Sequence, residues 1–80
     1  MKILTFEYEK TQEALHINTN SDGLRYLASE LLKLADQVEK QTNDHIHLMT
    51  EEWGGHELNS QAQSKTSEII NHVKIFGWES

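Results

Sequence analysis

The segment SDGLRYLASELLKLADQV (21–38) constrains the fold most, because its apolar residues recur at spacings of three and four. This repeat is typical of an α-helix with one apolar face. Asn20, Ser21 and Asp22 can cap the free N–H groups at its start. We expect the centre of the stripe, Leu31, to be buried, so that Leu31→Asp should unfold the domain. The apolar stripe consists of Leu24, Leu27, Ala28, Leu31, Leu34, Ala35 and Val38.

The segments on either side of this helix alternate as β-strands do. Residues 3–9 and 14–18 are joined by a short charged turn, which predicts a β-hairpin. Residues 45–50 and 68–78 predict a third and a fourth strand, separated by a polar segment (59–66) that we expect to be a mobile loop. The side chains expected to face the helix are Leu4, Phe6, Tyr8, Leu15, Ile17, Ile46, Leu48, Ile69, Val73 and Ile75.

This order of elements predicts an α+β fold, a four-stranded antiparallel sheet (ββαββ) with one amphipathic helix packed on one face. A helix of about 18 residues is roughly 27 Å long, so it returns the chain along the sheet and leaves the third strand parallel to the second. The spatial strand order is then 2-1-3-4 or 1-2-4-3, and both orders stay open. We expect residues 1–80 to form a single domain.

The amino-acid composition argues against several classes of function. The chain has 13 acidic and seven basic residues and a net charge of −6, which argues against nucleic acid as a partner. The absence of cysteine fits a reducing compartment, and no run is apolar enough for a signal peptide or a membrane span. We therefore expect a cytoplasmic protein without a membrane partner. With no Gly-x-Ser-x-Gly elbow and no phosphate-binding loop, the sequence does not predict an enzyme or a cofactor.

Histidine is the residue type in excess. His45 and His47 lie two apart and project from one face of their strand, and the alternation places His16 and His72 on the same outward face. Four imidazoles there, with Glu51 or Glu57, have the chemistry to bind Zn²⁺ or Ni²⁺. This gives one hypothesis, a small metal- or ligand-binding regulatory domain that dimerises through its His-rich sheet face. The alternative is that these are ordinary solvated histidines, and we expect no metal.

The loop EEWGGHE (51–57) has the most unusual local chemistry. Its paired glycines permit a sharp reversal of the chain direction. Trp53 either packs onto the edge of the core or is exposed and available to bind a partner. Aromatic residues often anchor protein interfaces, and carboxylates around one select a basic surface. Phe76 and Trp78 form a second aromatic pair on the outer face of the last strand, where an exposed patch would indicate self-association or docking of a partner.

Three segments together resemble the bacterial immunity protein 32 family of polymorphic toxin loci. They are DGLRYLASELLKLAD (22–36), HIHLMTEEWGGHELN (45–59) and VKIFGW (73–78). The resemblance covers most of the chain, in order. It implies an antidote protein that stays in the cytoplasm and binds the toxin encoded beside it, and it brings no catalytic residues with it.

The mechanism implied by this resemblance is occlusion of a toxin, and a nuclease with a basic active-site cleft is one candidate. From the residues alone, we expect the acidic, tryptophan-bearing loop to make the first contacts, with the neighbouring histidines beside it. Charge attraction would speed association, and a buried aromatic anchor would slow release. The predicted partner-binding residues are Glu51, Glu52, Trp53, His56, Glu57, His45 and His47.

Overall fold

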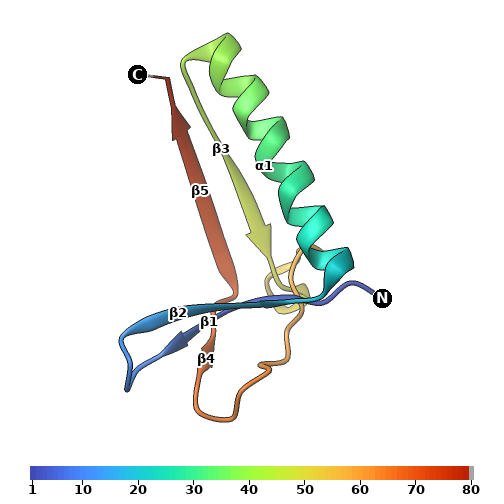
Figure 1. The fold of residues 1–80 in the computed structure, drawn as a ribbon, viewed down its shortest axis with the longest axis vertical. Helices are drawn as coiled ribbons and strands as arrows, with labels where there is room; N and C mark the ends of the chain where they lie inside the picture. The colour runs from blue at the N-terminus through green and yellow to red at the C-terminus, as the bar shows by residue number, and fades with distance from the viewer. Residues whose placement is uncertain (80) are drawn as a thin grey trace.

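The computed structural model, which describes residues 1–79, confirms the α+β class with one helix and antiparallel sheets (Figure 1). The predicted hairpin is present, and the chain enters the helix directly from it. The elements in chain order are β1 (Leu4–Glu9), β2 (Ala14–Thr19), α1 (Ser21–Gln41), β3 (Asn43–Met49), the 3₁₀-helix η1 (Glu51–Trp53), β4 (Glu68–Ile69) and β5 (His72–Trp78).

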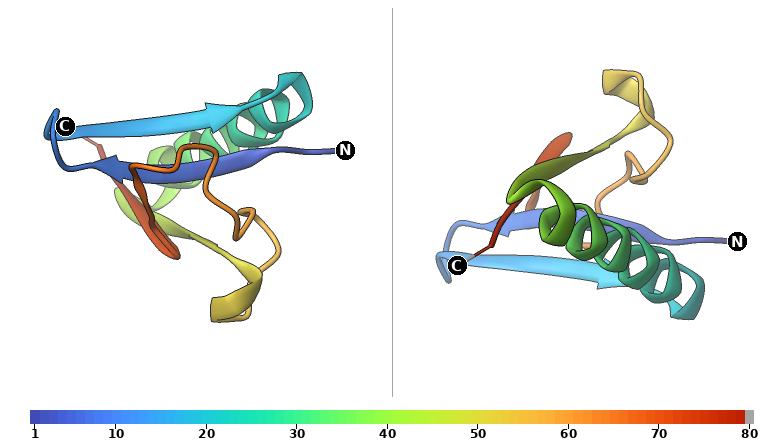
Figure 2. Two further views of the ribbon diagram at one scale, coloured as in Figure 1. Left: turned by 90° about the horizontal axis from the view of Figure 1, so that it is seen from below. Right: turned by 90° about the horizontal axis from the view of Figure 1, so that it is seen from above.

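The prediction of one four-stranded sheet is wrong. Within residues 1–79 the strands form a three-stranded sheet in the order β2-β1-β4 and a separate two-stranded sheet of β3 and β5, with antiparallel pairs in both. Neither of the two predicted strand orders therefore occurs. The strands of the two sheets run at a steep angle to each other, and α1 lies along the two-stranded sheet (Figures 1 and 2).

The cause of this split is a bend in the segment that the alternation predicts as one strand, residues 68–78. The chain first pairs with β1, ending with a hydrogen bond from the Ile70 N–H to the Phe6 carbonyl (2.8 Å). It then turns at Asn71, whose side-chain and backbone oxygens accept hydrogen bonds from Thr50 (2.7 and 3.0 Å). Because the bend changes the alternation, Ile70 packs against the core in the place predicted for Ile69.

The helix starts where its sequence signals predict. Asn20 is the N-cap, and its side chain accepts a hydrogen bond from the Gly23 N–H (2.9 Å). Gly23 also lets the first turn pack closely, since a Cβ there would lie 2.0 Å from the Ile3 carbonyl oxygen. The helix continues to Gln41, past the predicted stripe, and ends at Thr42 in the left-handed conformation.

Only part of the predicted stripe is buried. Leu34 and Val38 are buried against the sheet, and Leu27 is half-buried, but Leu24, Ala28 and Ala35 are exposed. Leu31, predicted to be at the centre of the buried face, is 41% exposed. The two-stranded sheet is too narrow to cover the whole apolar face of the helix, so one side of the stripe remains in solvent.

The core lies where the two sheets and the helix meet. Leu4, Phe6 and Leu48 face it as predicted, and Leu58 from the loop after η1 completes it. The outer half of the hairpin extends beyond this core (Figure 2). There three residues predicted to face the helix, Tyr8, Leu15 and Ile17, are exposed instead.

The polar segment 59–66, predicted to be mobile, is tied to the outer face of β1 by two buried carboxylates. The Glu7 carboxylate, 0% exposed, accepts hydrogen bonds from the Gln63 N–H (3.0 Å) and the Ser64 N–H (3.3 Å). Glu9 accepts one from the Thr66 hydroxyl (2.7 Å). These contacts seal the outer face of the three-stranded sheet, which the single-sheet prediction had left open.

Candidate functional site

Six aromatic and imidazole rings form a continuous row on the outer face of the β3–β5 sheet and the adjoining turn. We call this row the aromatic–histidine surface. Antiparallel pairing sets His45 opposite Phe76 and Met49 opposite His72, and side chains two apart in each strand share a face. The row consists of Trp53, His72, His47, His45, Phe76 and Trp78, in that order.

The rings contact each other along the whole row. Trp53 lies 5.9 Å from His72, centroid to centroid, and His72 stacks on His47 at 5.1 Å. His47 meets His45 edge-on at 4.8 Å, and His45 lies 5.2 Å from Phe76. A last stacked pair joins Phe76 to Trp78 at 6.0 Å. These separations are typical of favourable aromatic pairs, so neighbouring rings hold one another in place.

The three histidines are also joined through their nitrogens. His47 Nε2 lies 3.0 Å from His45 Nε2, and His47 Nδ1 lies 2.8 Å from His72 Nε2. Both nitrogens of His47 are engaged, so the three side chains do not direct their nitrogens at one point. Among residues 1–79, no three His, Asp or Glu side chains are arranged to hold a metal ion. His16, predicted to share this face, lies on the other sheet beside Gln12.

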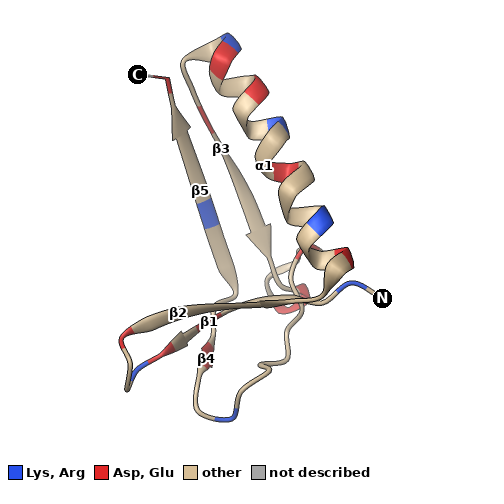
Figure 3. Ribbon diagram, viewed as in Figure 1, with Lys and Arg blue, Asp and Glu red and all other residues tan. Residues whose placement is uncertain are grey.

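Electrostatics favour the neutral form of the central imidazole. Partial burial lowers the pKa of His47, and the nearby positive charges of His45, Lys74 and His72 lower it further. Lys74 is the one residue of β5 that is a lysine, arginine, aspartate or glutamate, and its Nζ lies 5.9 Å from the centre of the Phe76 ring (Figure 3). Lys74 lies opposite His47 in the strand pairing, so one lysine stands beside the middle of the row.

Large apolar side chains on this surface are open to solvent. Trp53 is 58% exposed, Phe76 is 51% exposed and Trp78 is 71% exposed. Exposed aromatic residues in one contiguous patch are unusual on a small soluble domain and mark interaction sites. Sequence alternation placed Phe76, Trp78 and His72 on an outward face, but they were not among the predicted partner-binding residues.

The predicted loop residues divide into two groups. Glu51, Glu52, Trp53 and His56 are exposed, and Gly54 makes the predicted turn with φ of 88°. Glu57 is instead used within the fold, since its carboxylate accepts a hydrogen bond from the Met49 N–H (2.9 Å). Burial alone would raise the pKa of Glu57, but this backbone hydrogen bond and the nearby charge of His56 outweigh it and lower the pKa.

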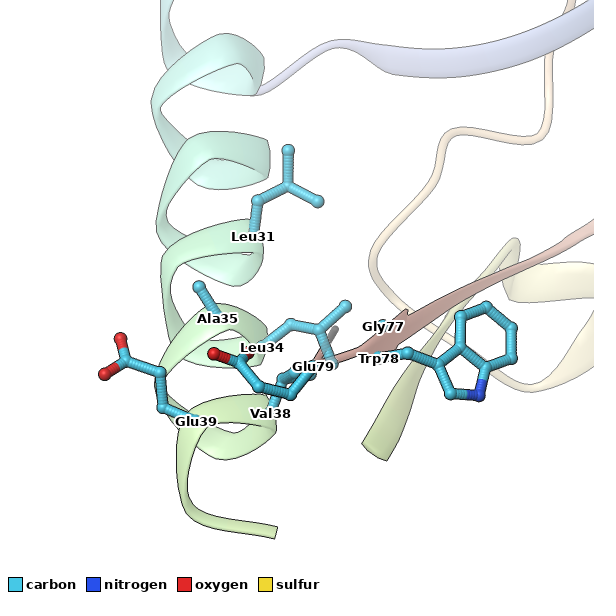
Figure 4. A pocket seen from close by; sticks show the side chains of 8 residues that line it. All are labelled: Leu31, Leu34, Ala35, Val38, Glu39, Gly77, Trp78 and Glu79. Carbon is cyan, nitrogen blue, oxygen red and sulfur yellow. The ribbon is translucent and has the colours of Figure 1, made fainter. Parts of the chain in front are cut away.

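A shallow groove lies at the far end of the same sheet, between the last turns of α1 and the end of β5, and its lining includes Glu39 and Glu79 besides apolar residues (Figure 4). Leu31, Leu34 and Val38 line its helical side, and Gly77 lines the strand side. The Trp78 ring turns away from the helix (Figure 4). The groove and the aromatic–histidine surface therefore adjoin at the end of β5.

No helix among residues 1–79 combines the length and the apolar character that crossing a membrane requires. No curated protein and no solved structure matches the chain. A family model described as Immunity protein 32 matches residues 14–73, which is more than half of the 80 residues and includes β2, α1, β3 and the loop after it. The chain therefore belongs to the Immunity protein 32 family.

Proposed function

We propose that this protein is an antitoxin-type immunity protein that binds a cognate bacterial toxin domain and occludes it in the cytoplasm of the producing cell. Membership of the Immunity protein 32 family supports the general role. The observation that supports this mechanism most is the exposed aromatic–histidine surface. A purely structural role would not require three large aromatic side chains to be exposed to water.

In this proposal the aromatic rings supply the affinity. Trp53, Phe76 and Trp78 are already held by stacking against neighbours, so burying them under a partner costs little side-chain entropy. Rigid aromatic side chains at the centre of an interface are typical hot spots, each worth about 2 kcal/mol or more on truncation to alanine. The partner is therefore expected to present an apolar patch, such as the rim of an active-site cleft.

In this proposal, charged residues orient the protein relative to its partner as the two approach. Glu51 and Glu52 are exposed beside Trp53 at one end of the row, and the net charge of −6 attracts a basic partner from a distance. A nuclease toxin, whose cleft must be basic to bind nucleic acid, fits this requirement. Glu57 contributes little to such steering, because its carboxylate is already paired with Met49 and His56.

The proposal is tested by protection. The toxin domain encoded beside this gene is expressed from an inducible promoter, alone or with this protein, and survival is counted. We expect the wild-type protein to restore growth and to copurify with the toxin domain as a stable complex. Full toxicity in the presence of folded wild-type protein, with no complex on size-exclusion chromatography, would rule the proposal out.

A further inference from the structure

The free edge of β2 carries a second binding surface, remote from the aromatic–histidine surface. β2 is one of the two edge strands of the three-stranded sheet, and its six residues pair with β1 without a bulge. Its sequence, ALHINT, contains no charged residue and no proline. Natural proteins usually protect exposed edges with charges, proline or bulges. β3 contains Asp44, β5 contains Lys74 and β4 has only two residues, so the β2 edge is the least protected.

The backbone geometry shows which groups this edge offers. The Phe6 carbonyl bonds to Ile70 on the β4 side, so Phe6 and its partner Ile17 form a non-hydrogen-bonded pair. The N–H and C=O of Ile17 therefore point away from β1, and those of Leu15, two residues before, point the same way. The Leu15 and Ile17 side chains are 55% and 46% exposed on one face of the strand.

We propose that a second copy of this chain binds the β2 edge, with the two β2 strands antiparallel and the two-fold axis at His16. In an antiparallel pair, opposite residues share a face. An axis at His16 sets Leu15 opposite Ile17 of the other copy, and Ile17 opposite Leu15. Both residues point their backbone groups toward the new partner, so these two pairs form the hydrogen-bonded rings.

Of the registers with the axis at Leu15, His16 or Ile17, this is the one in which both Leu15 and Ile17 lie opposite an apolar residue of the other copy. An axis at Leu15 would oppose Ile17 to Glu13, and an axis at Ile17 would oppose Leu15 to Thr19. With the axis at His16, four apolar side chains join into one cluster, and the three-stranded sheets become one six-stranded sheet. The occupant is a second copy because the strand is complementary to itself, as a two-fold interface requires.

The register is tested by a single cysteine, since the chain contains none. Residues at the axis form a non-hydrogen-bonded pair with Cα atoms about 4.5 Å apart, within reach of a disulfide. We expect His16→Cys to form a covalent dimer in a glutathione redox buffer. The matched control is Ala14→Cys on the same face, whose two thiols would lie along the strands about 13 Å apart and stay reduced. Equal cross-linking of both variants, or of neither, would refute the register.

Self-association itself is measured by sedimentation equilibrium of the complete protein from about 10 µM to 1 mM. We expect a monomer–dimer equilibrium that Ile17→Lys abolishes, with the folded state of the variant confirmed by circular dichroism. Phe76→Ala should leave the dimer intact. A wild-type protein that stays monomeric throughout, or a dimer lost in Phe76→Ala and kept in Ile17→Lys, would overturn the proposal. No toxin enters these measurements, so they fail or succeed independently of the proposed function.

Discussion

The outer faces of the two sheets differ in how they meet water. On β1 the outward residues are Thr5, Glu7 and Glu9, and a loop covers them so well that all three are buried. On β3 and β5 the outward residues include Phe76 and Trp78, and no other part of residues 1–79 covers them. The polar face is sealed and the aromatic face is open, the reverse of what residue polarity alone predicts.

The difference shows what each face contributes. Glu7 accepts hydrogen bonds from side chains of the sheet and from backbone and side-chain groups of the loop, so its negative charge organises the protein's own chain. The rings of the aromatic–histidine surface contact one another, and Trp53, Phe76 and Trp78 remain more than half exposed. Stability is therefore expected to depend on the sealed face, and binding on the open one.

The largest effect is expected from Glu7→Gln. The amide replaces one carboxylate oxygen with an NH₂ group that faces other donors, whichever way it turns, because both oxygens accept bonds from the Gln63 N–H. We expect the free energy of unfolding to fall by about 3 kcal/mol, as measured by urea denaturation. Glu39→Gln, an exposed carboxylate on α1, is the control and should change it by less than about 0.5 kcal/mol. Equal effects would mean that the seal contributes nothing.

Lowering the pH should weaken the hydrogen bonds that Glu7 makes on the outer face of β1. Burial disfavours the charged form of Glu7, but hydrogen bonds from Ser67, Thr5 and the backbone of Gln63 and Ser64 outweigh it and lower its pKa from 4.5 to about 2. A depressed pKa stabilises the fold above the unfolded value and loses this contribution as the pH falls. The contribution of Glu7 to the free energy of unfolding should stay constant from pH 7 to 5 and then drop by up to about 3 kcal/mol toward pH 2. Glu7→Gln should show a shallower drop; identical acid profiles would contradict this role.

A smaller effect is expected on the open face. Because the pKa of His47 is lowered in the folded protein, its neutral form is favoured there. The contribution is present above the unfolded histidine pKa and is lost as the pH falls through it. Stability should therefore decline modestly between pH 7.5 and 5.5, and His47→Gln should reduce that decline. Denaturation at the two pH values measures it, and a steeper decline in the variant would argue against the histidine cluster as described.

Local periodicity was enough to predict the hairpin, the helix start at Asn20 and the outward side of His45 and His47, because each depends on neighbours in sequence. It failed for the sheet arrangement, since the bend at Asn71 is fixed by hydrogen bonds to Thr50 from far along the chain. The exposure of Leu31 follows from the same split, because a two-stranded sheet covers less of the helix.

The candidate site was predictable in part. Alternation placed His72, Phe76 and Trp78 on an outward face, and both predicted strand orders set the last two strands side by side, so the row could have been assembled from the sequence. Glu57 could not be separated from Glu51 and Glu52, because only the folded loop brings it to the Met49 N–H. The same holds for Glu7, whose partners in the loop lie 56 to 60 residues away along the chain.

The most direct test is the affinity of the double variant Trp53→Ala/Phe76→Ala for the toxin domain that the proposed function requires as a partner, measured by isothermal titration calorimetry. Leu32→Ala, a similarly exposed apolar residue on α1, is the matched control. We expect the double variant to raise the Kd at least 100-fold, about 2.7 kcal/mol or more, and to melt within a few degrees of the wild type. The control should bind normally. A folded double variant that binds the toxin as tightly as the wild type would contradict the assignment of the open face as the binding surface.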